Sequence, residues 1–62
     1  MMPYTDTEKL EAIRREIKWR KRVYPNRVET GRMPPAEAAF QISIMEAIAV
    51  DYERLAAKER LF

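Results

Sequence analysis

The sequence contains neither cysteine nor histidine. Their side chains supply the common transition-metal ligands, the thiolate nucleophile and the most frequent general base of enzymes. Their absence excludes a disulfide framework and removes the usual ingredients of hydrolase chemistry. Ser43 is the only serine, and no base stands at a spacing that would activate it. We therefore expect no enzyme activity, no metal and no cofactor.

Glycine is almost as scarce, because Gly31 is the only one. A single glycine cannot form a phosphate-binding glycine-rich loop, and there are too few turn residues for an all-β fold. No run of about 18 apolar residues is present, so no membrane span is expected. Residues 1–10 lack a basic stretch followed by an apolar one, and we expect a cytoplasmic protein.

What the sequence does have is a high content of both apolar and charged residues. The 62 residues are 47% hydrophobic and 35% charged, which is too apolar for disorder and suits one compact unit. A chain this short buries only about 60% of the surface that its unfolded form exposes. The composition predicts a single all-α domain that is stabilised by helix packing or by a partner.

The start and end of a first helix are marked by capping and proline signals. Thr5 and Glu8 have the spacing of a capping box, in which each side chain accepts a hydrogen bond from the other residue's backbone N–H. Pro25 has no N–H to donate and disfavours helical torsions in Tyr24. These signals predict a first helix over about 5–24.

A connector and a second helix follow. The connector is predicted over 25–34, where one helical turn can form and Gly31 can end it with a positive φ. Pro35 is tolerated in the first turn of a helix, and no breaker follows it, so the second helix is predicted over about 35–61. The whole chain, 1–62, is then one antiparallel helical hairpin.

The two predicted helices carry more apolar surface than a single hairpin can bury. The first helix has a stripe of Leu10, Ile13, Ile17 and Tyr24, with Ala12, Trp19 and Val23 on its opposite side; the second has a row of Ala38, Ile42, Met45, Ala49, Tyr52 and Ala56 and a neighbouring row of Ile44, Ile48, Leu55 and Phe62. The two rows span an arc of roughly 160°, which is wider than the facing stripe.

Self-association is the simplest way to cover the second row. We expect a homodimer in which two hairpins complete a four-helix bundle. The residues expected at this oligomer interface are Val23, Ile44, Ile48, Leu55 and Phe62. The alternative is a core formed within one chain only.

Charge is unevenly distributed along the chain. Residues 14–32 contain eight basic and two acidic residues, although the net charge of the protein is only +2. Arginines interleaved with aromatic rings suit the binding of an acidic protein or a nucleotide, and the candidate residues are Trp19, Arg20, Arg22, Tyr24, Arg27 and Arg32. The alternative is an ordinary solvated helix face, with cations near the negative end of the helix dipole. The acidic remainder argues against a dedicated nucleic-acid binder.

Arg20 stands out because it occupies a position of the apolar stripe. One interpretation directs its guanidinium between the helices, toward a carboxylate such as Asp51 or Glu59, or toward a bound anion. The alternative is that its aliphatic stem covers apolar surface while the charged group reaches water.

Four short motifs carry a resemblance to a known group of proteins: Val23-Tyr24-Pro25, Gly31-Arg32-Met33, Met45-Glu46-Ala47-Ile48 and Asp51-Tyr52. Over about residues 10–55 the chain resembles short uncharacterised helical proteins encoded in phage and prophage genomes of proteobacteria. Pro34 is a departure, because such sequences tend to have Thr or Ser after the methionine as a helix cap. The resemblance implies a phage origin and a small accessory protein that binds a host factor or sequesters another molecule, and it implies no activity and no functional residue.

Three functions remain open at this point. The first is a phage-type accessory protein that binds a host or phage protein through its basic connector region. The second is a small nucleotide-binding or nucleotide-sequestering module, and the third is a structural assembly component without a ligand site.

Overall fold

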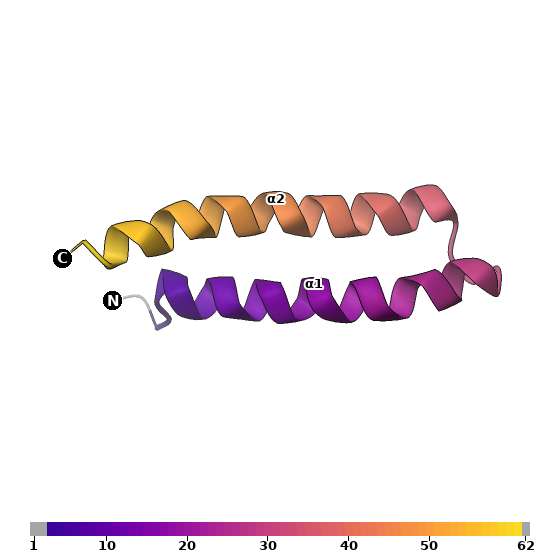
Figure 1. The fold of residues 1–62 in the computed structure, drawn as a ribbon, viewed down its shortest axis with the longest axis horizontal. Coiled ribbons are helices and arrows are strands. Elements are labelled where there is room, and N and C mark those ends of the chain that lie inside the picture. The colour runs from indigo at the N-terminus through magenta and orange to yellow at the C-terminus, as the bar shows by residue number, and fades with distance from the viewer. Residues whose placement is uncertain (1–2, 62) are drawn as a thin grey trace.

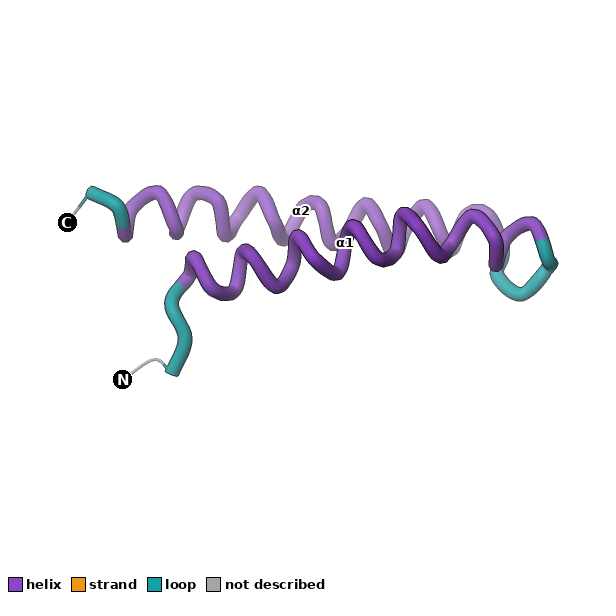
Figure 2. Tube along the Cα trace, turned by 60° about the horizontal axis from the view of Figure 1, so that its bottom comes forward, coloured by secondary structure: helices purple, strands orange, loops and turns teal. Residues whose placement is uncertain are grey.

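The computed structural model describes residues 3–61 and contains two helices, α1 (Asp6–Glu29) and α2 (Pro35–Glu59). They lie side by side and antiparallel, with the connector at one end of the molecule and both termini at the other (Figure 1). Figure 2 shows that the two helix axes cross at a shallow angle. The predicted all-α hairpin is confirmed, and within 3–61 no strand is present.

The capping box at the start of α1 is confirmed. Thr5 is the N-cap: its Oγ1 accepts from the Glu8 backbone N–H at 3.0 Å, and its own N–H donates to Glu8 Oε1 at 2.9 Å. Both bonds satisfy backbone donors that have no partner within the helix. The first helix, predicted to start at about residue 5, therefore begins at Asp6, one residue after its cap.

The predicted end of the first helix at Tyr24 is wrong. Pro25 lies inside α1, which continues for another turn to Glu29. A proline removes its own N–H bond, here to Lys21, and its ring crowds the Lys21 carbonyl. That carbonyl belongs to an exposed residue, so water can reach it. The end of α1 bends out of line with the rest of the helix (Figure 1), as a proline inside a helix is known to cause.

The true connector is only residues 30–34. Gly31 has φ +76°, a left-handed conformation that ends the helix and that other residues adopt at a cost. The backbone N–H groups of Arg32 and Met33 both donate to the carbonyl oxygen of Arg27, at 2.8 and 3.2 Å. The turn expected within the connector is thus the last turn of α1.

The second helix begins at Pro35 as predicted and ends two residues before the predicted end. Its N-cap, Pro34, makes no side-chain hydrogen bond to the helix. At the other end the N–H of Leu61 donates to Lys58 rather than to a residue four positions back, which closes the last turn tightly. Phe62 lies outside the described residues.

The contact between the helices, called the seam below, has a small core. Leu10 packs with Ala49 and Ala56, which is fully buried, and Ile13, Ile17 and Tyr52 pack around them. Small side chains let the two helix backbones approach closely. Five of the described residues are buried: Leu10 and Tyr24 from the predicted stripe of α1, and Ala38, Ala49 and Ala56 from the first predicted row of α2. In the described part of the chain, neither helix has an apolar stretch long enough to cross a membrane.

Candidate protein-binding site

Four of the six predicted binding residues gather on one part of α1. Trp19 and Tyr24 meet edge to face, with ring centroids 6.3 Å apart and planes at 76°. The Arg27 guanidinium lies over both rings, 5.4 Å from the centroid of Trp19 and 5.8 Å from that of Tyr24, and the Arg20 guanidinium lies 6.0 Å from Tyr24. We call Trp19, Arg20, Tyr24 and Arg27 the aromatic–arginine cluster. Its rings hold Arg27 by cation–π attraction.

The members of this cluster differ in exposure. Tyr24 is buried at the seam, whereas Trp19 keeps 39% of its surface exposed. No described residue forms a salt bridge with Arg27, although its side chain is ordered against two rings. An arginine held in this way has lost conformational freedom before a ligand arrives, and its donors can still meet a carboxylate or phosphate.

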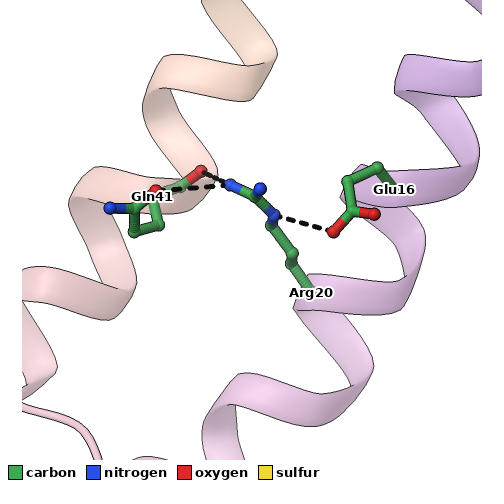
Figure 3. A network of polar contacts seen from close by, with 3 residues as sticks. All are labelled: Glu16, Arg20 and Gln41. Atoms are coloured by element: carbon green, nitrogen blue, oxygen red, sulfur yellow. Dashed lines mark hydrogen bonds and ion pairs between the residues drawn. The ribbon is translucent and has the colours of Figure 1, made fainter.

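Arg20 is directed between the helices, where it bridges α1 and α2 (Figure 3). Its Nε donates to Glu16 Oε2 at 2.9 Å, and its Nη1 donates to the backbone carbonyl oxygen of Gln41 at 2.8 Å. The side chain is only 19% exposed, so it does not simply reach out into water. The predicted partners Asp51 and Glu59 are wrong, because the register of the two helices places Gln41 opposite Arg20.

The other two predicted binding residues lie apart from the cluster. Arg22 is exposed, and the helical repeat turns it about 140° away from Arg27 around α1. Arg32 is exposed in the connector, one turn beyond the end of the cluster. The structure therefore supports a cluster of four residues with two further arginines at its margins.

The two sides of the seam differ in chemistry. On one side, called the ion-paired side, Arg14 meets Glu53 at 3.6 Å and Lys21 meets Glu46 at 3.0 Å. All four of these side chains are about half exposed. Val50 lies on the same side of α2, four residues after Glu46 and three before Glu53. Exposed pairs of this kind contribute little to stability.

The opposite side, called the apolar side, carries the Arg20–Gln41 bond and the Lys9 ammonium, which lies 5.8 Å from the Tyr52 ring centroid. Ile44 and Ile48 follow Gln41 by three and seven residues and so lie on this side of α2. The predicted interface residues Val23, Ile44, Ile48 and Leu55 all lie here, and Phe62 lies outside the described residues. Ile44 is 42% exposed and Leu55 is 39% exposed, while Val23 and Ile48 are half-buried. As expected, the single hairpin leaves the second row of α2 partly exposed to solvent.

Glu59 closes the end of the molecule opposite the connector. Its carboxylate accepts hydrogen bonds from the backbone N–H of Thr7 at 2.9 Å, from that of Asp6 at 3.1 Å and from the Thr7 hydroxyl at 2.9 Å. The bond from the Thr7 N–H is the main cause that lowers the pKa of Glu59, against a smaller opposing effect of desolvation. A carboxylate here also complements the positive end of the α1 dipole.

The sequence interpretation missed two exposed apolar residues on α2, Phe40 and Val50, which are 59% and 45% exposed. The spacing of Phe40, four residues before Ile44, already extended the second row by one turn. A surface pocket lies elsewhere, near the start of α1, and is lined by Tyr4, Glu8, Lys9, Ala12 and Arg15. Within 3–61 no acidic cluster is arranged to hold a metal ion.

Comparison of the chain with protein-family models, with curated proteins and with solved structures gives no match.

Proposed function

We propose that this chain is a non-enzymatic interaction protein of phage type, which acts in the host cytoplasm as a homo-oligomeric helical hairpin. Its basic connector region binds an acidic surface of a host or phage protein, and dimerisation completes a four-helix bundle. The observation that carries the proposal is Arg27, held over the rings of Trp19 and Tyr24 with no carboxylate partner among residues 3–61.

The distribution of charge supports an acidic partner. Residues 18–45, the half of the hairpin that includes the connector, contain six basic and two acidic residues. The remaining residues contain six basic and eight acidic ones, so the two halves carry net charges of opposite sign. A basic end attracts an acidic partner from a distance and orients it before contact.

The residue types at this end also support protein recognition. Tryptophan, tyrosine and arginine are the residues that most often dominate the energy of protein interfaces. Trp19 offers a large apolar surface beside the fixed cation of Arg27, and Arg22 and Arg32 add cations at the margins. The phage resemblance points the same way, because a small accessory protein that binds a host factor needs a surface rather than a catalytic site.

The test reverses charge at the connector end. In the variant R27E/R32E, we expect the affinity for an acidic, glutamate-rich peptide to fall at least tenfold, measured by the fluorescence of Trp19, the only tryptophan. Capture of host proteins from a lysate should fall in parallel, while helicity by circular dichroism stays the same. The matched control is R15E/R54E, which makes the same change in charge at exposed residues of the other half.

Two results would contradict the proposal. Equal binding by R27E/R32E and by the wild type would remove the connector from the site, and equal losses in both double variants would indicate only a nonspecific effect of net charge. Loss of helicity in R27E/R32E would instead assign these residues to the structure.

The nucleotide alternative is favoured by one feature, the exposed Trp19 ring beside a fixed guanidinium, since a base can stack on such a ring. It predicts a raised Tm with individual nucleotides in a thermal-shift panel and an elevated ratio of absorbance at 260 to 280 nm in the purified protein. If no nucleotide in the panel raises the Tm, the nucleotide alternative is wrong.

A further inference from the structure

The apolar side of the hairpin has the size of a protein interface. The molecule is 48 Å long and 17 Å wide, so one lateral face offers roughly 800 Å², which is the area that each partner contributes to a standard interface. Ile44 and Leu55 are exposed on this face, whereas the ion-paired side is crossed by two salt bridges. The hairpin alone buries only five of its described residues, three of them alanines, and so small a core usually needs further support.

We propose that a second copy of this chain covers the α2 row of the apolar side, around Ile44, Ile48 and Leu55, in an antiparallel orientation that leaves Trp19 and Arg27 of α1 outside the interface. A twofold axis perpendicular to the helices passes near the middle of α2, so that α2 packs on α2 of the second copy and the two connectors lie at opposite ends. This inference rests on the homo-oligomer of the proposed function and specifies its face and its direction.

The position of the isoleucines fits such an axis. The helix α2 spans Pro35–Glu59, so Ile44 and Ile48 lie on either side of its midpoint. A twofold axis between them places Ile44 of each copy against Ile48 of the other, and the same patch serves on both copies. The most apolar part of the side is therefore buried at the centre of the interface, with the charged ends of the helices at its rim.

The charges of the two halves decide the direction. In the antiparallel arrangement, the basic half of each copy, residues 18–45, lies beside the acidic half of the other. The parallel arrangement would place two basic halves side by side, which carry four net positive charges each. Like charges in register along an interface weaken it and select against that orientation.

The first experiment tests the face with two matched variants. Ile44 and Val50 are β-branched residues of α2 with similar exposure, 42% and 45%, on opposite sides of the seam. We expect I44D to raise the dimer dissociation constant at least tenfold by light scattering and sedimentation, and V50D to leave it unchanged. The reverse result would place the interface on the ion-paired side and overturn the proposal.

The second experiment tests the direction. Because the chain has no cysteine, a spin label can be attached to E29C alone, at the exposed end of α1. We expect the two labels of a dimer to lie roughly 35–40 Å apart, about the length of a 24-residue helix, and a label at S43C, near the middle, to give a shorter distance. A short distance for both labels would show a parallel dimer and overturn the orientation.

A wild-type protein that stays monomeric at high concentration would overturn the proposal together with the homo-oligomer. Binding of an acidic partner through Arg27 and Arg32 is measured separately and would stand or fall on its own result.

Discussion

The ion-paired side and the apolar side flank the same seam and are built by the same two helices, yet they expose different kinds of side chain. On the ion-paired side, half-exposed charges meet across the seam and face water. On the apolar side one arginine, Arg20, makes the polar contact between the helices, and large aliphatic side chains stay exposed around it. Exposed ion pairs of this kind contribute little to stability, whereas exposed apolar patches are typical of interaction surfaces. The hairpin thus presents one charged side and one apolar side, and the apolar side is the one to which we assign the proposed second copy.

The largest expected effect comes from breaking the seam on which both sides depend. Leu10 is 3% exposed and packs on Ala49 and Ala56. We expect L10A to lower the free energy of unfolding by about 2–4 kcal/mol, because it removes buried apolar surface and leaves a cavity. Urea unfolding measures this. The control is L61A at a residue that is 77% exposed, where a change of more than about 0.5 kcal/mol would contradict the assignment of the core.

The next largest effect is expected at Arg20, which makes the polar contact between the helices on the apolar side. We expect R20M, which keeps the aliphatic stem and removes the guanidinium, to cost about 1–2 kcal/mol, because the hydrogen bonds to Glu16 and Gln41 are lost. R20K keeps the charge but cannot reproduce the two directed donors, so it should fall in between. An increase in stability in R20M would show that a continuous apolar surface suits this side better than the bridging arginine.

A third prediction concerns Glu59, which closes the seam at the end far from the connector. Its pKa in the folded protein is lowered by hydrogen bonds from Thr7 and Asp6. Its contribution is therefore present above the pKa of the unfolded chain and is lost as the pH falls through the folded value. We expect E59Q to lower the Tm at neutral pH, and the difference from the wild type to vanish in acid. The control E11Q, at an exposed residue, should leave the Tm at neutral pH unchanged.

The smallest effect is expected on the ion-paired side. A double-mutant cycle between Lys21 and Glu46, whose charged atoms are 3.0 Å apart, should give a coupling of about 0.2–0.5 kcal/mol that disappears at high salt. Thermal unfolding of the wild type, K21A, E46A and the double variant measures it. A coupling above about 1 kcal/mol would show that the two sides are not as different as the structure indicates.

Local signals in the sequence were enough to predict most of the fold. The capping box of Thr5 and Glu8, the positive φ of Gly31 and the start of α2 at Pro35 each depend on residues within a few positions of one another. The three- and four-residue spacing of Leu10, Ile13 and Ile17 also predicted the face of α1 that packs on α2. Features that depend on a short stretch of chain can be predicted from it.

Pro25 could not be interpreted in this way. A proline weakens a helix locally, but here Tyr24 before it is buried at the seam, and the backbone carbonyl of Arg27 after it accepts the hydrogen bonds that close α1, so contacts on both sides of Pro25 keep the chain helical. Packing has overridden local preference. The partner of Arg20 could not be predicted either, because Gln41 lies beside Arg20 only through the register of the two helices. Six candidate binding residues were predicted, but neither the gathering of four of them in the aromatic–arginine cluster nor the stacking of Arg27 on two rings could be predicted from the sequence.

The layout of the seam also has a consequence for how the chain folds. Contacts between the helices join residues 21 positions apart near the connector, at Arg20 and Gln41, and 52 apart at the far end, at Thr7 and Glu59. The entropy lost on closing a loop grows with its length, so contacts near the connector form at the lowest cost. Each of them shortens the loop that remains for the next. We expect the hairpin to close as a zipper from Gly31 toward the termini, in the fast regime of helical proteins, with Glu59 docking last.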